Sequence, residues 1–256
     1  MPSAPRHAAS RAARAAAALS VLGAALLTGC SAAGALTAEP PVRESARPAP
    51  TLAPSASPAT PSPAPTALES SALQATAAAL DVIDESVETP PYRRADFGDG
   101  WVDVDRNGCS TRQDILQRDL EGKTLADDGC TVLTGTLAID PYTGATIDFA
   151  HDRIGGDSQA VQIDHIISLS AAHRGGAWAW SFDERVAFAN DPATLLAVDG
   201  PTNSAKSDRG PGDWMPEDPA YWCEYAARYT GIAHGYGLAV WSEDQRMLVD
   251  VLEACG

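Results

Sequence analysis

The sequence predicts an α+β fold built around two short buried strands followed by a helix. Apolar runs at 160–163 and 195–198 have the length of buried strands. A polar segment that begins at Asn203 follows the second run and is expected to open the helix. Helical patterns flank this unit on both sides, and an added β-hairpin and two disulfides complete the expected architecture.

The N-terminal residues 1–30 have the pattern of an export signal. A basic stretch precedes an apolar segment at 15–27, which is too short to be a comfortable membrane span. Leu27-Thr28-Gly29-Cys30 is similar to a bacterial lipobox, which implies cleavage before Cys30 and lipidation of its sulfur. A plain secretory signal with an incidental cysteine is the alternative. The chain is therefore expected to be exported, as a membrane lipoprotein that faces outside or as a secreted protein.

Residues 31–90 are predicted to be a disordered tether. From 31 to about 65 the chain is dominated by Ala, Pro, Ser and Thr, and such a segment has too little apolar bulk to offset chain entropy. The stretch 66–88 is rich in Ala and Leu and is compatible with a helix, but it has no clear cap and no strong apolar stripe. One domain of ordinary size is expected over 91–256, where all six tryptophans lie.

The first segment of this domain, Trp101–Cys109, is expected to be a strand that ends in an Asn-Gly turn. A calcium-binding loop is the alternative, because Asp103, Asp105 and Asn107 occupy alternating positions. A twelve-residue loop that starts at Asp103 would end at Asp114, whereas such loops end on the longer Glu. The strand and turn are therefore the preferred interpretation.

The rest of the domain alternates between β and helical patterns. A β-hairpin is expected from Thr131–Ile139 and Ala145–Phe149, because β-branched residues alternate on either side of an Asp-Pro-Tyr-Thr-Gly turn signal. Helices are expected where apolar residues recur every three or four positions, at Thr111–Leu120, Ser181–Ala189, Pro219–Tyr229 and Ser242–Ala254. His151 and His173 are expected in surface loops.

The domain contains four cysteines, Cys109, Cys130, Cys223 and Cys255. An even number in an exported domain predicts two disulfides. Of the three possible pairings, Cys109–Cys130 with Cys223–Cys255 is preferred, because each closes a local loop. A four-cysteine zinc site is the alternative, but the spacing lacks any C-x-x-C knuckle.

The charge of the domain argues against non-specific binding of nucleic acid. From residue 91 onward, the chain has 13 Lys and Arg residues and 27 Asp and Glu residues. Non-specific binding of DNA usually depends on a basic face. A nuclease with this charge must rely on a metal ion and a few placed cations, or on salt that screens the repulsion.

The residues that carry chemistry lie at the ends of the two buried strands. Asp164 and His165 end the first strand, and Asn203 follows the second. A carboxylate and an amide oxygen can share one Mg²⁺ or Mn²⁺, since such an ion keeps several waters. A neutral imidazole at His165 can take a proton from an attacking water. The order strand, strand, helix is that of a ββα-metal motif, and it predicts a site for metal-assisted cleavage of a phosphodiester.

Three cations are expected to hold substrate phosphates. Lys206 and Arg209 come just after Asn203 on the predicted helix. Arg112 lies on the helix that follows the first turn and could reach a phosphate. A salt bridge to one of the many carboxylates is an equal alternative for Arg112.

Six segments in order resemble the HNH nuclease family of exported actinobacterial proteins, which is related to the C-terminal HNH domain of GmrSD-type restriction enzymes. The segments are Asn107–Arg112, Asp140–Gly144, Ile163–Ile166, Phe188–Pro192, Leu195–Gly200 and Asn203–Asp208. The resemblance implies an HNH (His-Me finger) core with His165 as general base and Asp164 and Asn203 as ligands of one divalent ion.

One position departs from the pattern of that family. The family usually has an Asn directly before the Leu-Leu-Ala-Val run, and that Asn is understood to orient the catalytic His. This chain has Thr194 there, and a threonine hydroxyl has a shorter reach. Either the activity is reduced, or Asn190 orients the His in place of the missing Asn.

The preferred hypothesis is an extracytoplasmic, metal-dependent HNH endonuclease that is monomeric and held at the membrane by a lipid on Cys30. Its expected substrate is nucleic acid, DNA rather than RNA. The alternative is a non-catalytic binding lipoprotein that retains the fold. A secreted zinc hydrolase of cell-wall material is the third hypothesis, and the sequence lacks the further zinc ligands that it requires.

Overall fold

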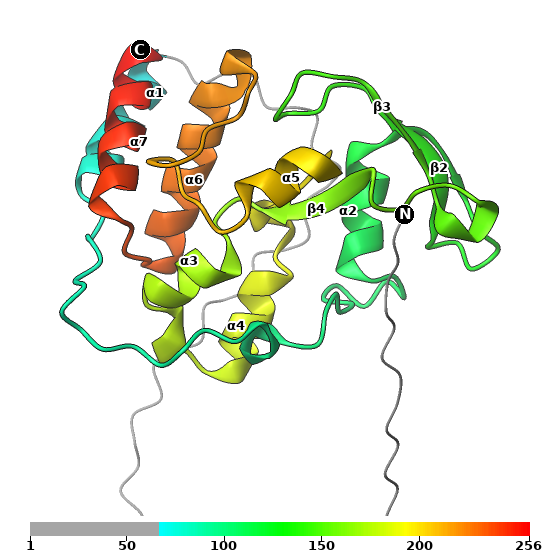
Figure 1. The fold of residues 1–256 in the computed structure, drawn as a ribbon, viewed down its shortest axis with the longest axis horizontal. Helices are drawn as coiled ribbons and strands as arrows, with labels where there is room; N and C mark the ends of the chain where they lie inside the picture. Colours follow the sequence, from blue (N-terminus) through cyan, green and yellow to red (C-terminus); the bar gives the residue numbers. More distant parts are fainter. Residues whose placement is uncertain (1–66) are drawn as a thin grey trace, which may run out of the picture. The chain divides into compact units, whose positions relative to one another are not determined.

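The computed structural model describes residues 67–256. The predicted export signal, the lipidated Cys30 and the tether up to residue 66 lie outside the described residues. The described part combines α-helices with two small antiparallel sheets, which is an α+β fold as predicted (Figure 1). Within it, no helix has the length and apolar character that a membrane crossing would require.

The larger sheet has three strands in the order β1-β2-β3. They are β1 (Glu121–Leu125), β2 (Val132–Leu137) and β3 (Ile147–Ala150). The predicted hairpin is confirmed, because β2 and β3 pair antiparallel and Asp140 closes the turn between them. Its carboxylate accepts a hydrogen bond from the Thr143 N–H at 2.8 Å, and Gly144 takes a positive φ of 72°. Strand β1 was not predicted, because all its residues are exposed and show no apolar alternation.

The smaller sheet pairs β4 (Val161–His165) with β5 (Leu195–Asp199), and α5 (Gly200–Lys206) follows directly. The strands are antiparallel, and His165 lies opposite Leu195. Helix α5 packs on both strands. It begins three residues earlier than predicted, because the Asp199 carboxylate caps the Thr202 N–H at 2.8 Å. Gly200 is required there, since an added Cβ would lie 1.9 Å from the carbonyl oxygen of Gln159.

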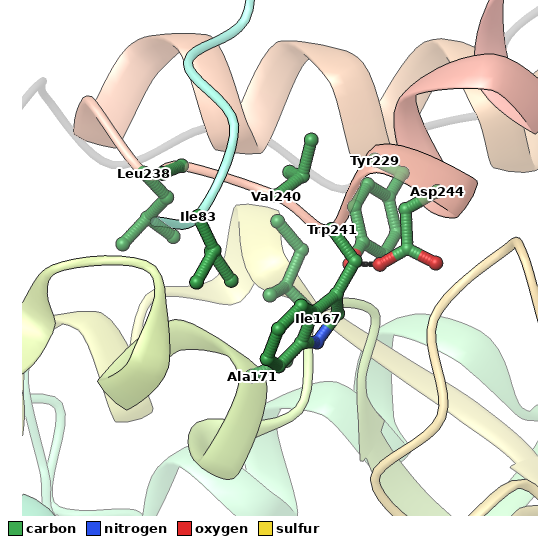
Figure 2. A pocket seen from close by; sticks show the side chains of 9 residues that line it. Ile83, Ile167, Ala171, Tyr229, Leu238, Val240, Trp241 and Asp244 are labelled. Carbon is green, nitrogen blue, oxygen red and sulfur yellow. Dashed lines mark hydrogen bonds between the residues drawn. The ribbon is translucent and has the colours of Figure 1, made fainter. Parts of the chain in front are cut away.

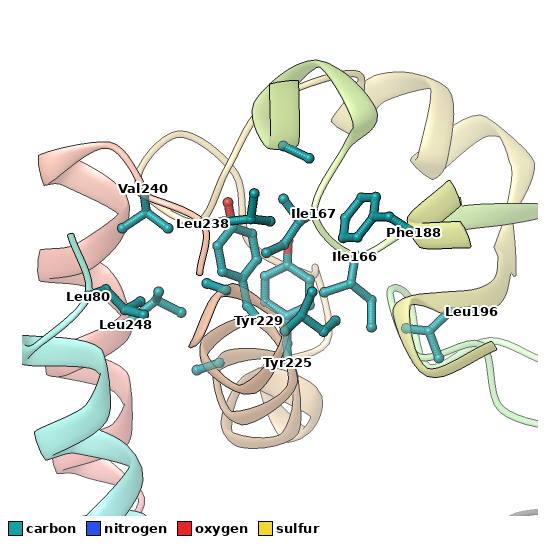
Figure 3. Close-up of a cluster of buried hydrophobic side chains, with 14 of the residues drawn as sticks. Leu80, Ile166, Ile167, Phe188, Leu196, Tyr225, Tyr229, Leu238, Val240 and Leu248 are labelled. Carbon is teal, nitrogen blue, oxygen red and sulfur yellow. The ribbon is translucent and has the colours of Figure 1, made fainter. Parts of the chain in front are cut away.

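The β4–β5 sheet separates two hydrophobic clusters. On one face Ile163 and Ala197 pack with α2 (Thr111–Asp119), which was correctly predicted as a helix. On the other face Leu196 joins the larger cluster drawn in Figure 3, which contains Tyr225 and Leu248. Alternate side chains of a strand point to opposite faces, so both clusters share the same two strands.

Three helices lie side by side, and the first of them is far from the other two in the sequence, as Figure 1 shows. They are α1 (Ala67–Ala78), α6 (Trp222–Tyr236) and α7 (Ser242–Ala254). Ala77 and Leu80 are buried in the larger cluster, and the Gln245 amide donates to the Leu80 carbonyl at 2.7 Å. The folded region therefore begins well before residue 91, and the predicted tether is too long at its C-terminal end. The small side chains of α1 do not reveal a buried face until α7 is placed against it.

The segment after α1 continues along the same domain. The Ile83 N–H donates to the Val240 carbonyl, and the Val240 N–H donates to the Asp81 carbonyl, both at 2.9 Å. Figure 2 shows Ile83 at a small pocket together with Val240, Tyr229 and Asp244. The pocket is mostly apolar, so docking of this segment is driven by burial as well as by its backbone hydrogen bonds.

Both predicted disulfides are confirmed. Cys109–Cys130 joins the segment just before α2 to the segment just before β2, and Cys223–Cys255 joins α6 to the end of α7. The Cα–Cα separations are 5.2 Å and 5.9 Å. The two bridges exclude the alternative of a four-cysteine zinc site.

The remaining elements agree with the sequence only in part. The predicted strand at Trp101–Cys109 is wrong, because Asp103 and Asp105 accept hydrogen bonds from the Asn107 N–H, each at 3.1 Å, and this closes the segment into a loop. The predicted helix at Ser181–Ala189 is confirmed as α4 (Phe182–Ala189) with a capping box at its start. Helix α3 (Leu169–Arg174) and the short 3₁₀ helix η1 (Arg94–Phe97) were not predicted.

Candidate active site

Asp164 and His165 end strand β4, so their side chains lie on opposite faces of the sheet. Their contacts agree with this alternation. The Asp164 carboxylate bonds to Lys206 of α5, whereas the His165 ring stacks on Trp101. Two adjacent residues therefore belong to different environments.

The imidazole of His165 is held on two sides. Its side chain is only 7% exposed, and the ring of Trp101 stacks on it with centroids 5.4 Å apart and planes 8° apart. Nε2 lies 2.8 Å from the carbonyl oxygen of Ala189, at the end of α4. Because a carbonyl can only accept, Nε2 carries the hydrogen and Nδ1 keeps the lone pair. Burial lowers the pKa of His165 from 6.5 to about 4, so the ring is neutral at pH 7.

A small cleft opens beside this ring, and Arg94, Trp101 and Leu169 contribute to its walls. The fully enclosed side-chain atoms without a hydrogen-bond partner in residues 67–256 are His173 Nδ1, Tyr225 Oη and Thr230 Oγ1. Nδ1 of His165 also has no hydrogen-bond partner, but it is not one of these enclosed atoms, so part of its surface is accessible. We infer that Nδ1 faces the cleft, where it can accept a proton.

Asn190 and Thr194 support the site differently from what the family pattern implies. Asn190 is fully buried, and its amide oxygen accepts the Val102 N–H at 3.0 Å. It thereby holds the residue next to Trp101, which stacks on His165. The Thr194 hydroxyl donates to the Asp191 carbonyl at 2.9 Å and is not hydrogen-bonded to the imidazole. Asn190 therefore orients the imidazole indirectly, through the aromatic ring that covers it.

The Asp164 carboxylate accepts hydrogen bonds from two buried side chains. The Lys206 ammonium lies 3.1 Å and 2.9 Å from its two oxygens, and the Tyr142 hydroxyl donates to Oδ2 at 2.5 Å. Lys206 has no exposed side-chain surface and also donates to the carbonyl of His165 at 3.0 Å. Burial and the neighbouring Asp164 charge raise the pKa of Tyr142 well above its usual value, so the phenol stays protonated as a donor.

Asn203 bonds elsewhere on the same face of β4. Its amide nitrogen donates to the Gln162 side-chain oxygen at 2.9 Å, and Gln162 precedes Asp164 by two residues. Lys206 lies one helical turn after Asn203, and it is Lys206 that reaches the carboxylate. Asn203 and Asp164 therefore share no partner in this arrangement.

The residues in this arrangement do not fit a divalent ion bound to Asp164 and Asn203. An ion at Asp164 would have to share the carboxylate with the ammonium of Lys206, and two positive charges at that distance repel each other strongly in a buried site. In the described part of the chain, no group of three or more His, Cys, Asp or Glu is arranged to hold a metal. Ligation by Asp164 and Asn203 stays a prediction.

The three cations predicted to bind phosphate all contact the protein itself. Lys206 is buried in the ion pair with Asp164. Arg112 donates to the Ser158 carbonyl at 3.0 Å, and its contact with a substrate phosphate stays a prediction. Arg209 donates to the Lys206 carbonyl at 3.1 Å.

Comparison with known proteins identifies the family. Residues 110–251 match the family described as GmrSD restriction endonucleases, C-terminal domain, and this range covers more than half of the chain. The chain belongs to the GmrSD C-terminal domain family. The resemblance found in the sequence is confirmed at this level.

One relative of this GmrSD-family chain is a protein of Arthroderma benhamiae named "Uncharacterized secreted protein". It is 35% identical over 157 residues, which span 60% of this chain and 72% of the relative. No solved structure matches the chain. The name states secretion for the relative and assigns it no activity.

The GmrSD family match contains His165, Asp164 and Asn203 but begins after Arg94 and Trp101. Both of these residues line the cleft at His165, and neither was predicted as functional. The sequence signal that was available is the Tyr-Arg-Arg run before Ala95, a cationic pair in an acidic domain. His173 was also placed wrongly, because it is buried and its Nε2 donates to the Pro90 carbonyl at 2.8 Å.

Proposed function

We propose that this protein is an HNH-type endonuclease that hydrolyses phosphodiester bonds of nucleic acid, with His165 as the general base. The observation that carries the proposal is the state of the His165 ring. The ring is neutral, Nε2 is tied to a carbonyl, and Nδ1 faces a cleft. Membership of the GmrSD C-terminal domain family supports the reaction type.

The roles of the protein groups follow from their contacts. Nδ1 of His165 accepts the proton of an attacking water, whose oxygen bonds to phosphorus while the bond from phosphorus to the leaving oxygen breaks. The Ala189 carbonyl keeps its hydrogen bond to Nε2 throughout and stabilises the imidazolium that forms. Trp101 restricts the ring plane, so that the lone pair keeps one direction.

We also propose that Mg²⁺ or Mn²⁺ assists the reaction, because a bound divalent ion stabilises the charge that develops on the phosphate. Asp164 and Asn203 remain the proposed ligands. Binding there requires the Lys206 ammonium to leave the carboxylate that it now contacts. No catalytic step is assigned to the ion.

Export, a lipid anchor on Cys30, a monomeric state and a preference for DNA over RNA are further parts of the proposal. Support for export comes from the relative that is named as secreted. The acidic composition of the chain suits an enzyme that acts outside the cell, where salt and divalent ions screen its repulsion of nucleic acid.

The test is incubation of the purified protein with plasmid DNA or RNA, with Mg²⁺, with Mn²⁺ or with a chelator. His165→Ala should abolish cleavage while its circular dichroism stays that of the wild type. His234→Ala is the matched control, because His234 is exposed on α6. Undiminished cleavage by the His165 variant would eliminate this mechanism. A folded wild type that binds nucleic acid but never cuts it would support the non-catalytic alternative.

A further inference from the structure

A single cation lines the cleft at His165 in the part of the chain that the structure describes. Arg94, the first residue of η1, forms one wall, and Trp101 and Leu169 contribute to the others. His165 lines the same cleft, so the guanidinium of Arg94 and the imidazole border one space. The position of Arg94 therefore combines nearness to the proposed base with access from outside.

Arg94 is not neutralised by a carboxylate. No ion pair joins it to an acidic side chain within residues 67–256. The neighbouring Arg93 is different, because it forms an ion pair with Asp96 at 2.7 Å. Arg94 therefore brings a positive charge without a carboxylate partner to the edge of the cleft at His165.

The short helix that carries Arg94 is held firmly in place. The Asp96 carbonyl accepts a hydrogen bond from the Arg185 side chain of α4 at 2.8 Å, and Phe97 is buried. Gly98 follows with a φ of 96°, and a Cβ there would lie 3.1 Å from Val186 of α4. Helix α4 also supplies Ala189, whose carbonyl accepts the hydrogen bond from His165 Nε2. Arg94 and His165 are thus positioned by one common support.

We propose that Arg94 binds the substrate phosphate that is attacked beside His165, and that it is a substrate-binding residue of this site. This inference rests on the proposed nuclease function. A guanidinium presents two parallel N–H groups that match two phosphate oxygens, and its charge offsets the negative field of the domain. With the phosphate held there, the water activated at Nδ1 lies next to the phosphorus. Lys206 is buried in the ion pair with Asp164, and neither Arg112 nor Arg209 is among the residues that line this cleft.

The experiment compares Arg94→Gln with Arg93→Gln in the full-length protein. Both changes remove one positive charge one residue apart, but Arg93 lies in an ion pair outside the cleft lining. Arg94→Gln should lower kcat/KM for DNA cleavage by about tenfold or more, whereas Arg93→Gln should stay within about twofold. Arg94→Lys should recover part of the loss, because it restores the charge but not the two parallel donors.

A binding measurement separates this inference from the proposed function. In a His165→Ala background, the affinity for a fluorescein-labelled DNA oligonucleotide is followed against salt concentration. Arg94→Gln should weaken binding and reduce the salt slope by about 1, and Arg93→Gln should do so less.

Each outcome of these two measurements decides a defined point. Cleavage and binding that are equal in the Arg94 and Arg93 variants would overturn the role of Arg94 and leave the nuclease proposal standing. If the wild type binds DNA without cutting it, the nuclease proposal fails and the salt slopes alone decide whether Arg94 holds phosphate. A wild type that neither binds nor cuts overturns both.

Discussion

The buried, neutral histidine predicts a specific dependence of stability on pH. The fold lowers the pKa of His165 from the unfolded value of 6.5 to about 4. A base with a lowered pKa contributes stability that is fully present above pH 6.5 and is lost as the pH falls through 4. Since one pKa unit corresponds to about 1.4 kcal/mol, the loss between pH 7 and pH 4 is about 3 kcal/mol.

The perturbation is His165→Gln, which removes the titration and keeps an amide N–H able to donate to the Ala189 carbonyl. The free energy of unfolding of the wild type and the variant is measured by urea denaturation at several pH values from 7 to 4. Other groups titrate in both proteins, so the quantity of interest is the difference between the two curves. That difference should change by about 3 kcal/mol in the direction that destabilises the wild type at low pH.

The control is His234→Gln, because His234 is exposed and its loss should leave the wild-type pH dependence in place. Parallel curves for the wild type and His165→Gln from pH 7 to pH 4 would refute the reasoning. They would mean that the pKa of the imidazole is the same in the folded and the unfolded chain, so that the ring is as well solvated in the fold as out of it.

Two further variants test the supports of the site. Lys206→Met should cost about 3–5 kcal/mol of unfolding free energy, because it leaves the Asp164 carboxylate buried without its counter-charge, and adding Asp164→Asn should recover most of the loss. A single-variant loss below about 1 kcal/mol would show that the ion pair is absent in solution. Asn190→Ala should cost about 1–3 kcal/mol, because it leaves the buried Val102 N–H without its acceptor. It should also lower kcat more than it raises KM, since it loosens Trp101 over His165; equal kcat in the variant would contradict this support.

Much of this fold follows from signals that act over short distances. The β2–β3 hairpin depends on the turn around Asp140, and each disulfide closes a local loop. Strand β5 begins with an apolar run of strand length, and α7 has a regular apolar stripe. A residue and its neighbours within one turn or one pleat determine such features, so the sequence predicts them directly.

The geometry of the candidate site depends on contacts between distant residues, which local sequence patterns do not predict. Asp164 and His165 were correctly placed at the end of one strand and Asn203 on a helix, but their partners could not be read from spacing. Lys206 and Asn203 are both polar residues of α5, and only the packing of that helix decides which of them meets the Asp164 carboxylate. The same holds for the predicted strand at Trp101–Cys109, where Asp103 and Asp105 instead accept the Asn107 N–H and close a loop.

The sequence by itself determined the family, the disulfides, the hairpin and the identity of the candidate base. Tertiary structure decided that α1 belongs to the domain, that Lys206 neutralises Asp164, and that Arg94 lines the cleft of His165. The physical reason is that burial and charge pairing depend on residues that are distant along the chain. Their free energy is set only when the helices and the β4–β5 sheet have packed together.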